Sequence, residues 1–252
     1  PTLHLAGYKL SIDDLKEFRQ LNSLTPGHPE YMHTDGIDST SGPLGQGIAM
    51  ATGMAIAEEY LAAKYNKDKH KMIDHFTYAL CGDGDLQEGV SAEAHSLAGT
   101  QELGNLNIIY DDNRISIEGD THNAFTEDVS ARFRSYGWQV IDVPAAADGR
   151  IDLPAVDAAM ISARAELTKP SLIRMHSVIA WPAPKAKGTA GSHGSALGAE
   201  EIAETKKILG LNPDEHFALP ADVFAHVRKV KERGAQARQD WDARLKPWQA
   251  NN

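Results

Sequence analysis

The sequence predicts an α/β protein in which a mostly parallel sheet carries helices on both faces, followed by a helical extension at the C-terminus. Two observations support this fold class. Short, near-continuous apolar runs alternate along the chain with helical patterns, as in repeated strand–helix–strand units. In addition, a chain of 252 residues with 42% hydrophobic content is long enough to bury a sizeable core.

The expected strands are apolar at consecutive positions, which is typical of strands buried on both faces of a sheet. They span residues 75–81, 106–110, 138–143 and 171–178. Helical patterns connect them at residues 88–103, 127–136 and 153–167. A further helix is expected at 47–65, where Ala49, Gly53 and Ala57 leave one face flat enough for close packing. Because strand–helix–strand units form right-handed crossovers, these elements predict a mostly parallel sheet.

A domain boundary is expected at residue 198. Residues 1–198 are assigned to the α/β domain, and residues 199–252 to a peripheral helical extension or a linker to a missing domain. Two polar helices are expected in the extension, at 199–209 and 221–245, after a Pro- and Gly-rich loop at 180–188. The chain opens at Pro1, and its first residues look like the end of an apolar helix, so we expect a fragment.

Composition excludes several classes of function. The formal net charge of −10 disfavours binding to nucleic acid or to an anionic membrane, because phosphate groups would be repelled. No run approaches the length of a membrane-spanning segment, and no signal peptide is visible. Cys81 is the only cysteine and ends an apolar strand, so we expect a core residue in a reducing compartment. These features predict a cytoplasmic protein.

A charged residue follows the first expected strand directly, in the segment CGDGDLQEG at residues 81–89. Asp83 lies between two glycines at the carboxyl end of this strand, where ligands bind in open parallel sheets. The flanking glycines would let the backbone approach a bulky anion. An Asp at this place is equally expected as a helix cap, and the segment alone leaves both roles open.

A second oxygen ligand follows the next expected strand. Asn113 comes 30 residues after Asp83, at the end of residues 106–110. If the two strands are neighbours, a carboxylate, an amide and a backbone carbonyl can converge into a partial shell suited to Mg²⁺, and the ion would then hold a diphosphate. The competing phosphate fingerprints are absent, since GPLGQG at residues 42–47 matches neither GxGxxG nor a P-loop.

These motifs resemble the transketolase family. GDG followed by Asn is similar to the thiamine diphosphate motif, and TPGHPE, GPLGQG, DDNRISI and SHG occur in the family's order over nearly the whole chain. The resemblance implies that residues 1–198 bind thiamine diphosphate and Mg²⁺, with Ca²⁺ or Mn²⁺ as substitutes. It implies metal ligation by Asp83, Asn113 and the main-chain oxygen of Ile115. It implies cofactor contacts from Gly42, Leu44, Gly82, Gly84, Glu88, Asn113, Ile117 and His193.

Two histidines are implied to be catalytic. His28 lies in a rigid Pro-Gly-His-Pro turn, and the resemblance places it against the hydroxyketone end of the donor sugar. His193 follows a Gly-rich loop that could close over the cofactor. Glu88 has two readings: compensation of a helix dipole, or membership in a carboxylate network between the two active sites of a dimer. The remaining histidines, among them His33, His70, His75, His95, His122, His176 and His216, are expected to be ordinary core or surface residues.

The resemblance implies transfer of a two-carbon ketol unit from a ketose phosphate to an aldose phosphate, as in the pentose phosphate pathway. The family carries further histidines before Leu3 and an activating glutamate in a later domain, so the chain alone should be inactive. Its expected partners are a second copy, a separate chain with the second thiamine-binding domain, or both. Two alternatives stay open: another thiamine enzyme, such as dihydroxyacetone synthase or 1-deoxyxylulose-5-phosphate synthase, and a non-catalytic cofactor-binding scaffold.

Overall fold

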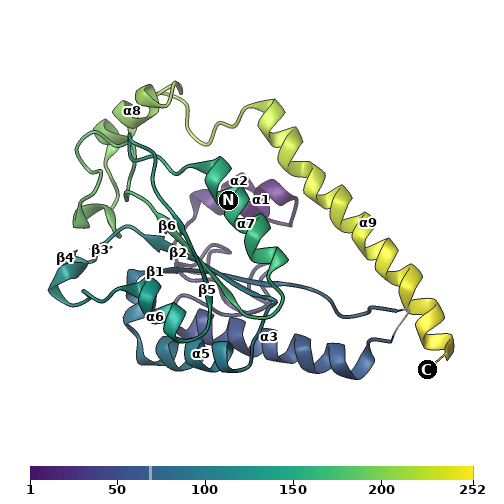
Figure 1. Cartoon of the computed structure of the whole chain (residues 1–252). Helices are drawn as coiled ribbons and strands as arrows, with labels where there is room; N and C mark the ends of the chain where they lie inside the picture. The colour runs from purple at the N-terminus through teal and green to yellow at the C-terminus, as the bar shows by residue number, and fades with distance from the viewer. Residues whose placement is uncertain (68–69, 252) are drawn as a thin grey trace. The chain divides into compact units, whose positions relative to one another are not determined.

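The computed structural model describes residues 1–67 and 70–251. Within them, four strands form one sheet in which every neighbouring pair is parallel, as Figure 1 shows. In spatial order these strands are β1 (Thr77–Gly82), β2 (Leu106–Asp112), β6 (Ser171–His176) and β5 (Gln139–Val143). The prediction of a parallel α/β sheet is therefore confirmed. The strands that precede Asp83 and Asn113 are neighbours, which was the condition for the predicted metal site.

The chain reverses its direction across the sheet at β5. It moves outward from β1 to β2, crosses to the far edge at β5, and returns to β6 beside β2. In open α/β sheets, ligands bind outside the carboxyl ends of the strands. Asp112 at the end of β2 pairs in register with His176 at the end of β6.

Helices cover both faces of the sheet. One core cluster joins Ile108, Tyr110 and Leu172 of the sheet to three helices, α3 (Gln46–Tyr65), α5 (Gly89–Thr100) and α6 (Val129–Ser135). The other joins the alternate strand residues Ile109 and Ile173 to α7 (Leu153–Ala165). Figure 1 shows α5 and α6 on one side of the sheet and α7 on the other. Successive residues along a strand therefore pack into opposite core clusters.

Several predicted boundaries differ from the structure. The helix predicted at 88–103 corresponds to α5, which ends at Thr100. A separate short helix, α4 (Asp83–Gln87), was not predicted, and Glu88, which is extended with ψ of 136°, separates it from α5. The strand predicted from His75 begins at Thr77, and the one predicted to reach Val178 ends at His176. A short hairpin, β3 (Ile115–Ser116) with β4 (Gly119–Asp120), was not predicted, since a pair of two-residue strands leaves no periodic signal.

The chain divides into two compact units. The sheet unit comprises Leu44–Tyr60 and His75–Asp214 and includes α8 (Ala199–Ile208) and the 3₁₀ turns η1 (Thr121–Asn123) and η2 (Ala190–Ser192). The helical unit comprises Pro1–Pro43, Leu61–Asp74 and Glu215–Asn252 and includes α1 (Thr2–Ala6), α2 (Ile12–Lys16) and α9 (Ala221–Asn251). The boundary expected at residue 198 stays a prediction.

The helical unit is held together by α9. The indole N–H groups of Trp241 and Trp248 donate to the backbone carbonyls of Met72 and Tyr65 at 3.0 and 2.8 Å. The helix predicted at 221–245 reaches residue 251, with Pro247 inside it. Among the described residues, no helix combines the length and apolar character needed to cross a membrane.

Candidate cofactor and metal site

Asp83 is the first residue of α4 and follows β1 directly. Its side chain is buried, with 4% of the residue exposed. One carboxylate oxygen accepts the hydroxyl of Tyr110 at 2.6 Å, and the other accepts the backbone N–H of Arg114 at 3.1 Å. Burial raises the pKa of Asp83, the nearby Asp112 and Asp111 carboxylates raise it further, and the hydrogen bonds from Tyr110 and Arg114 oppose this rise. The alternative prediction, that Asp83 caps a helix, is wrong, because Gly82 occupies the N-cap position of α4.

Asn113 and Ile115 follow β2 in a tight turn. Arg114 adopts a left-handed conformation with φ of 59°, which turns the chain so that its own N–H reaches Asp83. The side-chain oxygen of Asn113 accepts the backbone N–H of Ile115 at 2.9 Å. The DDNRI segment therefore contacts Asp83 through the hydrogen bond from the Arg114 backbone N–H.

The donor chemistry at this edge fits a hard cation. A carboxylate, an amide oxygen and a backbone carbonyl are ligands that Mg²⁺ prefers. Among the described residues, no ion pair involves Asp83, so its buried charge lacks a cationic partner. A Cβ added at Gly82 would meet no atom within 4 Å, which leaves room for a ligand beside the strand end. Within the same residues, no group of three or more His, Cys, Asp or Glu side chains is placed to hold a metal.

Leu44 and Gly84, two expected cofactor residues, lie together. A Cβ at Gly84 would come within 3.2 Å of the Leu44 side chain, and the Leu44 side chain is exposed. Two other expected contacts, Glu88 and Ile117, are also exposed. Glu88 occupies the N-cap position of α5 without making a side-chain cap bond. Ile117 lies in the β3–β4 hairpin.

Sequence reasoning missed Asp85. Its carboxylate accepts the backbone N–H groups of Gly82 at 2.9 Å and Gly45 at 3.0 Å, so it joins the end of β1 to the GPLGQG loop. Gly45 has φ of +77°, and an added Cβ would approach Glu88, Val90 and Ser91 to 2.9 Å. The second Asp of GDGD was the available signal, because such a residue can accept loop N–H groups.

His28 and Gly42 belong to the helical unit and contact each other. Gly42 has φ of +123°, and an added Cβ would overlap the imidazole ring of His28. The loop that carries Gly42 also bonds back to the Pro-Gly-His-Pro turn, since the N–H of Ser41 donates to the carbonyl of Pro29 at 3.3 Å. The absence of a side chain at Gly42 therefore leaves the space that the His28 ring occupies.

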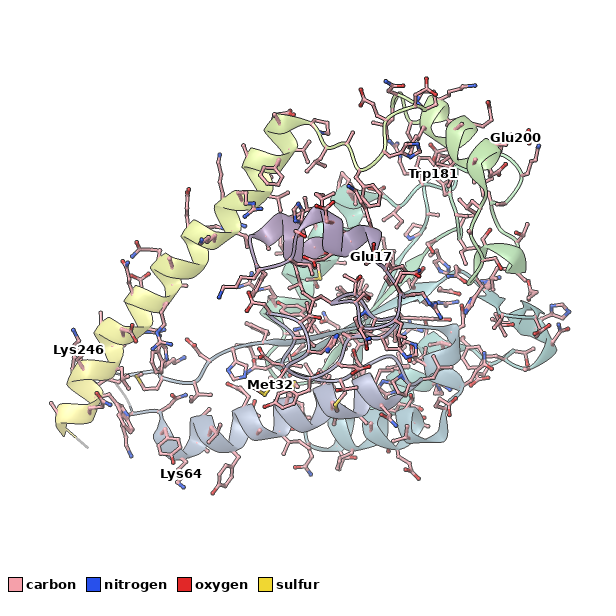
Figure 2. All side chains as sticks on the ribbon, turned by 180° about the vertical axis from the view of Figure 1, so that it is seen from behind. Glu17, Met32, Lys64, Trp181, Glu200 and Lys246 are labelled. Carbon is pink, nitrogen blue, oxygen red and sulfur yellow. The ribbon has the colours of Figure 1, made fainter. Side chains whose placement is uncertain are left out.

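His193 is exposed and follows η2, in the loop between β6 and α8. The buried Glu201 of α8 anchors this loop, because one of its carboxylate oxygens accepts the N–H groups of Lys185 and Ala186 at 2.6 and 2.8 Å. Figure 2 labels Trp181 of the same loop and Glu200, whose side chain is exposed beside Glu201. Glu201 is a second positioning residue that sequence reasoning missed.

Cys81 is buried, and burial raises the pKa of its thiol, which agrees with the expected core role. His95 is fully buried between Phe133 and Trp138, with ring centroids at 4.5 and 5.4 Å. Burial lowers the pKa of His95 to about 3. The expectation that His95 is an ordinary core residue agrees with this packing.

The family described as "Transketolase, thiamine diphosphate binding domain" matches the chain over residues 1–252. The chain belongs to the transketolase family. A transketolase of Geobacillus stearothermophilus is 50% identical over 244 residues, which are 96% of this chain and 36% of the relative. One from a Nostoc species is 52% identical over 241 residues, 95% of this chain and 35% of the relative.

Solved transketolase structures share the fold. A Pichia stipitis transketolase, solved with sedoheptulose-7-phosphate, superposes with a TM-score of 0.93 at 44% identity, covering 98% of this chain and 36% of that one. The Leishmania mexicana enzyme gives 0.94 at 42% identity, covering 99% and 37%. The chain thus spans about a third of the length of its relatives, and it is the thiamine diphosphate-binding part of a transketolase.

Proposed function

We propose that this chain is the diphosphate-binding half of an enzyme that transfers a two-carbon ketol unit from a ketose phosphate to an aldose phosphate. The family match and the transketolase relatives support this function. The observation that carries it is the buried Asp83 carboxylate, which faces the carboxyl edge of the sheet without a cationic partner among the described residues.

Asp83, Asn113 and the main-chain oxygen of Ile115 would hold Mg²⁺, or Ca²⁺ or Mn²⁺ in its place. Bound thiamine diphosphate would supply the electron sink for carbon–carbon bond cleavage, which no protein side chain provides. Cofactor contacts would come from backbone at Gly42, Gly82 and Gly84 and from side chains of Leu44, Glu88, Asn113, Ile117 and His193.

His28 and His193 would act on the sugar. Imidazole groups hydrogen-bond hydroxyls and exchange protons near neutral pH, as cleavage next to a hydroxyl requires. His28 is fixed by its turn and by its contact with Gly42, whereas His193 lies on a loop anchored by Glu201. We assign His28 to the hydroxyketone end of the donor sugar, and His193 to the diphosphate and reacting carbon of the cofactor.

Assembly with a second copy is part of the proposal, with or without a separate chain that carries the second domain. The helix α3 presents Gly53 with no atom near its Cβ position, and exposed apolar side chains lie close in sequence at Met54 and Ile56. Val90 and Leu97 of α5 are exposed as well. Exposed apolar side chains of this kind are typical of subunit contacts.

We further propose that this chain alone is inactive, that the whole enzyme is cytoplasmic, and that it serves the pentose phosphate pathway.

The experiment is a calorimetric titration of the full-length protein with thiamine diphosphate, in Mg²⁺ and after chelation. Binding should require the metal and should be lost in Asp83→Asn, which removes the charge but keeps the shape. Asp13→Asn, at a highly exposed position, is the control and should bind like the wild type. Equal cofactor affinity in Asp83→Asn and wild type would overturn the metal assignment.

The non-catalytic scaffold predicts a different result. In the full-length protein, His28→Ala should retain metal-dependent cofactor binding and should lose most ketol transfer. A scaffold would show no ketol transfer in the wild type and no change in the variant.

A further inference from the structure

Two buried carboxylates lie at the ligand-binding edge of the sheet. Asp83 and Asp112 are each 4% exposed. The hydroxyl of Tyr110 lies between them, 2.6 Å from an oxygen of Asp83 and 3.4 Å from an oxygen of Asp112. A phenolic hydroxyl carries one proton, so the short contact assigns that proton to Asp83.

The two carboxylates differ in their contacts with basic side chains. One oxygen of Asp112 receives the guanidinium of Arg174 through Nε at 2.8 Å and Nη2 at 2.7 Å, and Nδ1 of His176 lies 3.0 Å from it. Asp83 receives only the Tyr110 hydroxyl and the Arg114 N–H within the described residues. Arg174 therefore compensates Asp112, and Asp83 keeps a net charge for an incoming cation.

Tyr110 is rigid. It is 2% exposed, it lies on the β2 face that packs into the larger core cluster, and β2 is bonded on both sides, to β1 and β6. Tyr110 and Asp112 are two residues apart, so both side chains point to the same face of the strand. The hydroxyl therefore holds one oxygen of Asp83 from a fixed direction, while the Arg114 N–H holds the other.

We propose that Tyr110 is a positioning residue that fixes the Asp83 carboxylate for an octahedral cation. Asp112, which Arg174 and His176 contact, lies on the other side of the Tyr110 hydroxyl and helps to hold it in place. This inference rests on the proposed function, because it assumes that Asp83 binds the metal. Mg²⁺ demands near-ideal octahedral geometry, whereas Ca²⁺ accepts flexible ligand arrangements. A carboxylate held at both oxygens favours the stricter ion, so Tyr110 contributes to the selectivity of the site for Mg²⁺ over Ca²⁺.

The test uses Tyr110→Phe in the full-length protein, since this change removes the hydroxyl and keeps the ring. The dissociation constant of thiamine diphosphate is measured by calorimetry in saturating Mg²⁺ and, separately, in saturating Ca²⁺. Loss of a group that orients a metal ligand typically weakens affinity by about tenfold or more. We expect a loss of this order in Mg²⁺ and a smaller one in Ca²⁺.

Tyr78→Phe is the matched control, because Tyr78 lies on the neighbouring strand β1 and is 43% exposed. It should leave both dissociation constants unchanged. A general loss of folding would weaken binding equally with the two ions, so an unchanged ratio of the two constants in Tyr110→Phe overturns the inference. Unchanged affinity in both ions also overturns it. Failure of the wild type to bind cofactor with either ion would instead overturn the proposed function.

Discussion

The carboxylate of Asp85 accepts the backbone N–H of Gly45 at 3.0 Å, across 40 residues of sequence. The same carboxylate accepts the N–H of Gly82 at 2.9 Å. One side chain in α4 thus joins the loop before α3 to the strand end that precedes Asp83. Two motifs that sequence analysis treated separately, GPLGQG and GDG, are parts of one hydrogen-bonded structure.

Asp85→Asn should destabilise the protein and weaken cofactor binding. An amide has one acceptor oxygen, so its NH₂ group would face one of the two N–H donors, and that donor would lose its partner. The cost is about 1–3 kcal/mol in the free energy of unfolding. Chemical denaturation measures it, and calorimetry measures the cofactor affinity. Unchanged values of both would show that this carboxylate does not organise the loop.

Glu201→Gln should loosen the loop that carries His193. The carboxylate accepts two backbone N–H groups, at Lys185 and Ala186, and charge-assisted bonds of this kind are stronger than neutral ones. Hydrogen exchange at these two amides should become faster, and ketol transfer should fall. Glu200→Gln is the control, because the Glu200 side chain is 84% exposed and its ion pair with Lys185, at 3.2 Å, lies on the surface. Equal exchange rates in the two variants would contradict the anchoring role.

His95 should make stability depend on pH. Neither ring nitrogen of His95 has a hydrogen-bond partner in the described structure, and burial lowers its pKa from 6.5 to about 3. The unfolded chain therefore binds a proton that the folded chain rejects between these values. The His95 contribution is fully present above pH 6.5 and falls as the pH drops toward 3, by up to about 1.4 kcal/mol per unit.

The measurement is the free energy of unfolding from pH 7 to pH 4 for wild type, His95→Leu and His216→Gln. His95→Leu should lose stability less steeply as the pH falls, whereas His216→Gln, at an exposed position, should follow the wild type. Parallel curves for all three proteins would show that His95 does not titrate in this way.

Gly99→Ala should destabilise the sheet unit strongly. A Cβ at Gly99 would overlap the backbone carbonyl oxygen of Tyr136, and a backbone atom cannot move aside as a flexible side chain can. The expected cost is about 1–3 kcal/mol, as for overpacked cores. Gly89→Ala, where an added Cβ meets no atom within 4 Å, is the matched control. Thermal unfolding compares them, and equal midpoints would contradict the packing of α5 against this segment.

The sheet could be predicted because its central strands, β2 and β6, are covered on both faces, and such strands are apolar at consecutive positions. The edge strand β1 differs from this expectation, since Tyr78 and Leu80 are exposed. Ile108 and Ile109 enter opposite cores, yet both are apolar. The adjacency of β1 and β2 was a condition of the predicted metal site, and the structure meets it. The short helix α4 was not predictable, since the five residues Asp83–Gln87 are too few to show a helical period.

Asp83 and Asn113 could be proposed as metal ligands from sequence because each follows a strand directly, whereas Ile115 was implied by the family resemblance alone. Their supports could not be, since these depend on tertiary distances. Arg174 meets Asp112 across 62 residues, and Tyr110 meets Asp83 across 27. A tyrosine inside an apolar strand and an arginine near the end of another give no signal of their own in a single sequence.

The most direct test of the account is anomalous diffraction from crystals of the full-length protein grown with thiamine diphosphate and Mn²⁺. The account predicts one anomalous peak within about 2.5 Å of the Asp83 carboxylate, the Asn113 side-chain oxygen and the Ile115 carbonyl. Density for the cofactor diphosphate should lie beside that peak. A peak ligated by Asp112 instead of Asp83, or bound cofactor with no metal at Asp83, would contradict it.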